Sequence, residues 1–253
     1  MLKQVSSSVT TRLAVTAIST SLVCVVTMVF SVYVPQTRGF FNLGETMVFV
    51  SALLFGSFVG GFAGGVGSML ADVLLGFWFY APATLAIKAC EGGIVGVFCG
   101  RMPKSNSKLF WKVFTFGVGL MLGILLASVG SFYYSGTVEL RIGIPPPENP
   151  NVVFSIPSVL WYVLGACVFL LITLTGFALD PQFGWLVFTT LIGGAAMVTG
   201  YYLYQKFLLF PLFGIEAIAE AEIPINIGQM LIGLIVAVPI VKIVLRSLPQ
   251  FKS

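Results

Sequence analysis

The chain has 253 residues, of which 58% are hydrophobic and only 9% are charged, and its formal net charge is +4. Soluble domains are about 25% charged, so this composition excludes an ordinary soluble domain and indicates a protein of the lipid bilayer. The sequence contains no histidine, which excludes Ser-His-Asp and Cys-His catalysis and histidine ligation of a metal. We expect no cofactor, no metal and no nucleic-acid partner.

Eight apolar segments follow one another along the chain, each about long enough to cross a bilayer as a helix. The first is expected to be retained, because its apolar run is longer than a signal-peptide core and Val34-Pro35-Gln36 is a poor cleavage site. We therefore predict an all-α fold, a polytopic membrane helix bundle that forms a single membrane domain over residues 1–253. The segments cover roughly residues 11–34, 43–59, 60–79, 82–101, 109–134, 156–179, 184–210 and 224–247.

The distribution of charge in the loops predicts the orientation, since lysine and arginine accumulate on the cytoplasmic side of membrane proteins. With eight spans and an inside N-terminus, most basic residues fall inside, and loop acids such as Glu139 and Glu216 fall outside. An odd number of spans would destroy this separation. Both termini are therefore expected to be cytoplasmic.

Small residues and charges share one face of the third predicted helix and one face of the fourth. Small residues let membrane helices approach closely, so we expect these two helices to pack tightly, with Asp72 and Lys88 near one another. Charge within a span is costly and usually faces a bundle interior or a cavity. The two charges then either form an ion pair that fixes the helix register or contact a ligand. The two stripes are Gly60, Gly64, Ser68 and Asp72, and Lys88, Gly92, Gly96 and Gly100.

Further polar and aromatic residues lie at the predicted outer ends of the helices. The aromatic segment Phe77–Tyr80 either forms an interfacial belt or also closes a pocket. Asn226 and Gln229 share a helix face, and their amides need protein, water or a ligand as partners in a membrane. Glu222 falls in a short outer loop, where solvation is the simplest expectation, although it lies near the mouth of the site.

These residues define a candidate substrate site in the outer half of the bundle. Charged groups would pair with ligand charge, amides would orient ring heteroatoms and aromatic rings would stack, as in a mostly apolar pocket with a few placed polar groups. The candidate substrate-binding residues are Asn42, Glu45, Asp72, Tyr80, Lys88, Glu91, Tyr201, Asn226 and Gln229.

Several motifs together resemble the substrate-binding S component of energy-coupling-factor (ECF) vitamin transporters, in the branch associated with riboflavin, pyridoxine and hydroxymethylpyrimidine. The resemblance covers about residues 1–104 and 183–253, which makes 105–182 a predicted insertion of two spans with a proline-rich outer loop. The fold would then consist of six family-type spans plus two inserted ones. The motifs are FNLGE at 41–45, ALLFG at 52–56, GGVGSMLAD at 64–72, YAPAT at 80–84, IKACEG at 87–92, GYY at 200–202 and EIPINIGQ at 222–229.

The resemblance implies a transport protein rather than an enzyme, located in the plasma membrane of a prokaryote. It would capture a vitamin or related small heteroaromatic nutrient from outside. It would then associate with a transmembrane T component and two cytoplasmic ATPase subunits, and topple in the bilayer to release its cargo. Ala14, Ala17 and Ser21 would correspond to the alanine-spaced motif with which the family's first helix docks on the T component, although their spacing is not a clean Ala-xxx-Ala.

Two other functions remain open. A self-sufficient, ion-coupled secondary transporter would use Asp72 or Glu91 as a proton site, but such proteins often show internal repeats, and none is found. A membrane enzyme would need a metal-binding acidic cluster or a nucleophile with a base, whereas the acids here are scattered singly over the predicted helices.

Overall fold

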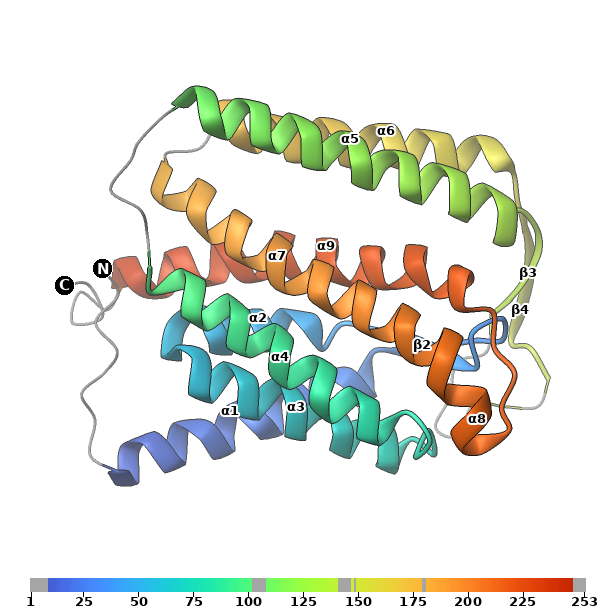
Figure 1. Ribbon diagram of the computed structural model, residues 1–253, viewed down its shortest axis with the longest axis horizontal. Helices are drawn as coiled ribbons and strands as arrows, with labels where there is room; N and C mark the ends of the chain where they lie inside the picture. Colours follow the sequence, from blue (N-terminus) through green and yellow to red (C-terminus); the bar gives the residue numbers. More distant parts are fainter. Residues whose placement is uncertain (1–8, 102–107, 141–146, 148, 179–180, 248–253) are drawn as a thin grey trace.

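The computed structural model describes residues 9–101, 108–140, 147, 149–178 and 181–247 of the chain. Within them, seven helices are long and apolar enough to cross a membrane, which confirms the predicted all-helical membrane bundle. They run roughly side by side (Figure 1). These helices are α1 (Val9–Val29), α3 (Ser57–Leu74), α4 (Ala81–Cys99), α5 (Lys108–Tyr133), α6 (Ser158–Ala178), α7 (Pro181–Tyr204) and α9 (Ala219–Ser247).

The remaining predicted span is a shorter helix, α2 (Glu45–Phe55), which has 11 residues. At 1.5 Å per residue it is about 16 Å long and does not reach across a bilayer by itself. Gly56 ends α2 and begins α3 with a φ of +85°, a backbone conformation that glycine adopts without steric cost. The expected turn between the second and third predicted spans therefore lies at this glycine.

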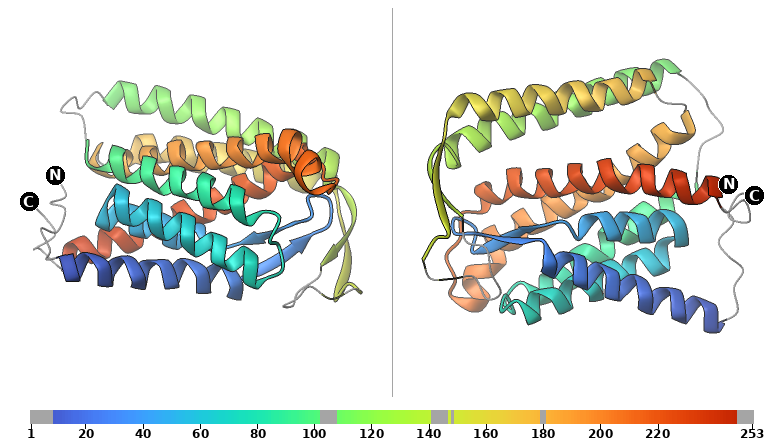
Figure 2. Two further views of the ribbon diagram at one scale, coloured as in Figure 1. Left: turned by 60° about the horizontal axis from the view of Figure 1, so that its bottom comes forward. Right: turned by 180° about the vertical axis from the view of Figure 1, so that it is seen from behind.

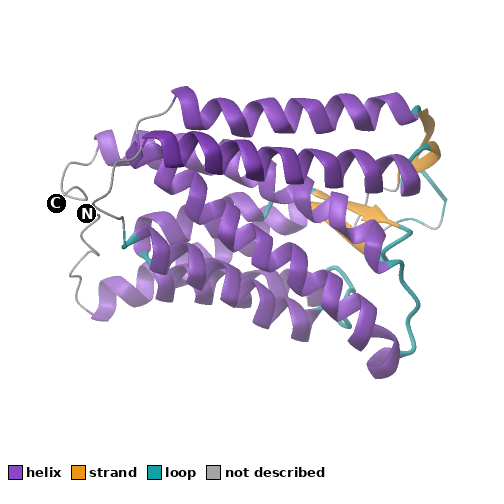
Figure 3. Cartoon of the chain, turned by 45° about the horizontal axis from the view of Figure 1, so that its top comes forward, coloured by secondary structure: helices purple, strands orange, loops and turns teal. Residues whose placement is uncertain are grey.

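Two β-hairpins lie at the end of the bundle opposite the start of α1 and the end of α9, and we call this the hairpin end (Figures 1 and 3). Strand β1 (Ser31–Val34) pairs antiparallel with β2 (Gly39–Asn42), with Ser31 opposite Asn42. Strand β3 (Gly136–Leu140) pairs with β4 (Val152–Ile156) in the same way. Residues 31–34 were expected to continue the first helix. They form a strand instead, because β1 finds its hydrogen-bond partners in β2.

The six helices α1, α2, α3, α4, α7 and α9 form one group, and α5 and α6 form a hairpin along its side (Figures 1 and 2). Helix α5 packs against α9, whereas α4 packs against α7, and α9 packs against both α2 and α7. The main apolar core lies among these helices and contains Phe49 of α2, Val95 of α4, Met197 of α7 and Met230 of α9. The assignment of α5 and α6 as an insertion stays a prediction, and residues 141–146 and 148 of the proline-rich loop lie outside the described residues.

Helices α3 and α4 approach each other through their glycines, as predicted from the small-residue stripes. A methyl group added at Gly64 would lie 2.8 Å from the carbonyl oxygen of Lys88, and one added at Gly60 would lie 3.0 Å from that of Gly92. Both distances are too short for a side chain. The glycines therefore allow backbone contact between the helices that carry Asp72 and Lys88.

Helix α1 begins and α9 ends at the same end of the bundle (Figure 2). This arrangement agrees with an even number of crossings. Which end faces the cytoplasm remains a prediction. The basic residues at positions 1–8, 102–107 and 248–253, which contributed to it, lie outside the described part of the chain.

Candidate functional site

A polar cavity lies toward the hairpin end, where β2, α3, α4, α7 and α9 meet. The volume of this cavity is about 30 Å³. All of the predicted site residues line it except Glu45 and Glu91, which contact Lys88. The lining residues are Gly39, Phe40, Asn42, Asp72, Tyr80, Thr84, Lys88, Tyr201, Glu222, Asn226 and Gln229.

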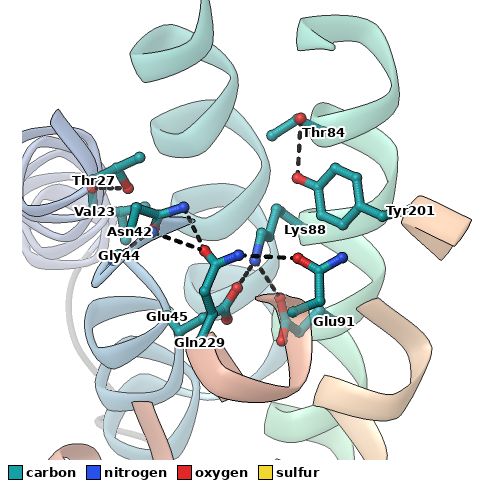
Figure 4. A network of polar contacts seen from close by, with 11 residues as sticks. Val23, Thr27, Asn42, Gly44, Glu45, Thr84, Lys88, Glu91, Tyr201 and Gln229 are labelled. Carbon is teal, nitrogen blue, oxygen red and sulfur yellow. Dashed lines mark hydrogen bonds and ion pairs between the residues drawn. The ribbon is translucent and has the colours of Figure 1, made fainter. Parts of the chain in front are cut away.

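Lys88 lies between two glutamates rather than beside Asp72. Its Nζ is 3.2 Å from Oε2 of Glu91, one turn further along α4, and it also contacts Oε1 of Glu45 in the first turn of α2 (Figure 4). All three side chains are buried. Of the two alternatives for Asp72 and Lys88, an ion pair between them is therefore not found among the described residues, although both side chains line the same cavity. The small-residue stripes correctly predicted that α3 and α4 pack together. They did not predict the contact of Lys88 with the Glu45 carboxylate, which comes from α2.

Hydrogen bonds between side-chain amides connect the end of β2 to α9 (Figure 4). The side-chain Nδ2 of Asn42 donates to Oε1 of Gln229 at 2.5 Å, and the Asn42 backbone N–H donates to the same oxygen at 3.3 Å. Nε2 of Gln229 donates to Oδ1 of Asn226 at 3.0 Å. These bonds orient the amides around the cavity. They leave Nδ2 of Asn226 buried without a partner among the described residues.

Tyrosines form another wall of the cavity. The Tyr80 hydroxyl donates to the backbone oxygen of Thr37 at 2.6 Å and accepts from Nε2 of Gln205 at 2.8 Å. The Tyr201 hydroxyl donates to Oγ1 of Thr84 at 3.0 Å. Burial, together with the nearby charge of Glu222, raises the pKa of Tyr80 well above its ordinary value. Tyr80 therefore presents a neutral, proton-bearing hydroxyl at physiological pH.

Glu222 belongs to the cavity, contrary to the expectation that it is solvated. Helix α9 begins at Ala219, earlier than predicted, so Glu222 lies in its first turn and is only 5% exposed. The side chains of Thr37, Gln205 and Asn226 surround its carboxyl group. The exposed Glu220, by contrast, pairs with Lys206 at 2.8 Å.

Two spacings in the sequence could have identified the residues that were missed. Glu222 lies four residues before Asn226 and seven before Gln229, so the three share a face once the helix is extended backwards. Thr84 lies four residues after Tyr80 and four before Lys88, on the cavity face of α4. The lining residues Gly39 and Phe40 carry no comparable signal, because their position depends on the β1–β2 hairpin.

Three buried atoms on the cavity wall have no hydrogen-bond partner among the described residues: Oδ2 of Asp72, Oε2 of Glu222 and Nδ2 of Asn226. Buried polar groups are normally satisfied, so the concentration of these atoms makes this cavity the candidate site. Within the described chain, no cluster of three acidic, cysteine or histidine side chains is arranged to hold a metal ion.

The fold and the site together define a multi-pass membrane protein with a buried polar cavity. The profile of the family "ECF-type riboflavin transporter, S component" matches residues 7–176, about two thirds of the chain. The chain therefore belongs to this family, as the motifs predicted, and the family is a class of transporter components rather than of enzymes.

One curated protein is similar to part of the chain. The chain is 51% identical over 76 residues to an "Uncharacterized protein in gap 3'region" of Pyrococcus woesei. This stretch is 30% of the present chain and 51% of the relative, so the chain spans about half the length of the curated relative that it matches.

The family match runs through α5 and most of α6 and ends before α7. The sequence motifs instead placed the family-type helices at 1–104 and 183–253. The match does not divide the chain at those positions, and the two-span insertion therefore stays a prediction.

Proposed function

We propose that the chain captures a vitamin or related small heteroaromatic compound from outside a prokaryotic cell, in the cavity described above. It would deliver this compound to a transmembrane T component driven by two cytoplasmic ATPase subunits. The observation that carries the proposal is the set of unpartnered, buried polar atoms of Asp72, Glu222 and Asn226 around one cavity.

The surface of α1 supports the proposed docking on a T component. Ala14, Ala17 and Ser21 are exposed, whereas Thr20 and Val23 are buried and pack against α3. Small side chains on the outward face let a second membrane helix approach closely. The three residues predicted for partner docking are thus available to a neighbouring protein.

Binding by the purified protein tests the site. Lys88→Ala and Asn226→Ala should each weaken binding of the compound that co-purifies with the wild type, identified by mass spectrometry, without blocking membrane insertion. Asn149→Ala, at an exposed position outside the helices, is the matched control and should bind normally. Unchanged affinity in both site variants would contradict the assignment of the site.

Reconstitution in liposomes tests the mode of transport. Uptake should require the T component and both ATPases, and Ala17→Trp should abolish co-purification with the T component while leaving binding by the isolated chain intact. Val163→Trp, on the exposed face of α6, is the control for a bulky residue in the membrane. Uptake driven by a proton gradient alone would support the ion-coupled alternative instead.

A further inference from the structure

The cavity region contains many more buried acidic groups than basic groups. Glu45, Asp72, Glu91 and Glu222 are each at most 5% exposed, and Lys88 is the one cation that lines the cavity among the described residues. Fully ionised, these five groups carry a net charge of 4 − 1 = 3 negative charges. Buried charges are normally paired, because removing an unpaired charge from water is costly.

The contacts of Lys88 divide the four carboxyl groups into two pairs. Lys88 contacts both Glu45 and Glu91, and neither of these lines the cavity. Asp72 and Glu222 line the cavity, and neither has a lysine or arginine nitrogen within 4.0 Å in the described chain. Lys88 therefore makes direct ion pairs with Glu45 and Glu91, whereas Asp72 and Glu222 share the cavity with Lys88 without an ion pair to it.

The carboxyl groups of Asp72 and Glu222 face a common space. Each has one oxygen without a hydrogen-bond partner among the described residues. Tyr80 lies near both carboxylates, and a methyl group added at Gly39 would lie 3.7 Å from the Tyr80 ring and 3.8 Å from Oε2 of Glu222. The two carboxyl groups and the Tyr80 ring therefore border the same cavity.

The aromatic lining favours a cation in the same place. Phe40, Tyr80 and Tyr201 all line the cavity, and Tyr201 already has the Lys88 ammonium 5.7 Å from its ring centre. Aromatic faces attract cations within about 6 Å, and they also stack on flat rings. Unpaired carboxylates and ring faces together form the kind of surface that binds a positively charged, planar group.

We propose that the solute bound by this site is an organic cation, a flat nitrogen heterocycle with a positive charge, and that Asp72 and Glu222 recognise this charge. This inference rests on the proposed function and specifies the class of substrate. A neutral ring would leave both carboxylates unpaired. A cation would pair with them, and Asn226 would contribute its free N–H as a donor to another part of the same molecule.

The experiment compares two probes that share one ring, nicotinamide and 1-methylnicotinamide, of which only the second carries a fixed positive charge. Affinities are measured with the full chain in detergent micelles at pH 7. We expect the cation to bind at least tenfold more tightly than its neutral parent. Asp72→Asn and Glu222→Gln should each weaken cation binding at least tenfold, whereas Glu216→Gln, at an exposed position, should not change it.

The inference would be overturned if nicotinamide or riboflavin bound at least as tightly as the cationic probe and if Asp72→Asn and Glu222→Gln lost no affinity. The proposed function would still stand after this result. If neither probe binds, the compound that co-purifies with the wild type is passed over a cation exchanger at pH 7. If the exchanger retains the compound, and if the protein that carries both Asp72→Asn and Glu222→Gln no longer co-purifies with it, the inference is supported. If the compound passes through the exchanger, the inference is overturned. A wild-type protein that binds no probe, no riboflavin and no cellular compound contradicts the proposed function itself.

Discussion

The hydroxyl of Tyr134 donates a hydrogen bond to the backbone oxygen of Ala221 at 2.8 Å. This bond connects the residue that follows α5 to the first turn of α9, directly before Glu222. Nε1 of Trp161 in α6 donates to the backbone oxygen of Tyr134 at 3.1 Å, so both helices of the α5–α6 hairpin contribute. Burial raises the pKa of Tyr134 well above its ordinary value, and the hydroxyl therefore keeps its proton. The hairpin thus supports one wall of the cavity from outside.

Removing this hydroxyl should weaken binding without changing any residue that lines the cavity. A typical hydrogen bond contributes about 1 kcal/mol, so Tyr134→Phe should raise the dissociation constant by roughly fivefold. Tyr133→Phe, one residue earlier, is the control and should bind like the wild type. Titration of both purified variants with the co-purifying compound checks this. Equal affinities would show that the hairpin does not support the site.

Neighbouring glycines of α4 should respond in opposite ways to the same substitution. A methyl group at Gly92 would overlap the backbone of Gly60 in α3, whereas at Gly93 no atom of another segment lies within 4 Å. Gly92→Ala should therefore force α3 and α4 apart and lower both the thermal stability and the affinity. Gly93→Ala should leave binding unchanged and raise stability slightly, because alanine favours a helix by up to about 1 kcal/mol over glycine. Thermal unfolding in detergent distinguishes them, and similar losses in both would contradict the helix contact.

Lys88 should matter more for stability than an exposed lysine in an ion pair. Lys88→Met leaves Glu45 and Glu91 buried without a cation, and breaking a buried pair typically costs about 3–5 kcal/mol. Adding Glu45→Gln to this variant should recover part of the loss. Lys206→Met removes the exposed partner of Glu220 and should cost less than about 1 kcal/mol. Chemical unfolding measures all three. A small effect of Lys88→Met would show that its neighbours are already neutral.

Cysteine labelling tests the predicted orientation. The four native cysteines, Cys24, Cys90, Cys99 and Cys167, are free thiols, so all can be replaced by alanine without breaking a disulfide. In that background, Thr137→Cys in β3 should react with an impermeant maleimide added to intact cells. Arg101→Cys, just beyond α4, should react only after permeabilisation. The reverse pattern would place the hairpin end in the cytoplasm.

The sequence predicted the helices well because their apolar runs have the length that a bilayer requires. It also predicted the contact of α3 with α4, since small residues spaced four apart mark a face. It failed where a contact depends on a third element. One of the two partners of Lys88, Glu45, comes from α2, and a spacing pattern within α3 or α4 contains no information about that neighbour. Glu222 was misplaced because helix boundaries are uncertain by a few residues, and an earlier start of α9 changes the environment of that carboxylate.

The attachment of β2 to α9 has a kinetic consequence. Asn42 bonds Gln229 through both its side chain and its backbone, next to a cavity with a volume of about 30 Å³. A ring compound needs more space than this, so the cavity has to widen before such a compound can bind, and these bonds hold the strand that borders it. Association should therefore follow the opening of the strand and reach a plateau at high concentration. The same bonds would also oppose release of the bound compound. Its residence time should therefore depend on the attachment of β2 as much as on the contacts inside the cavity.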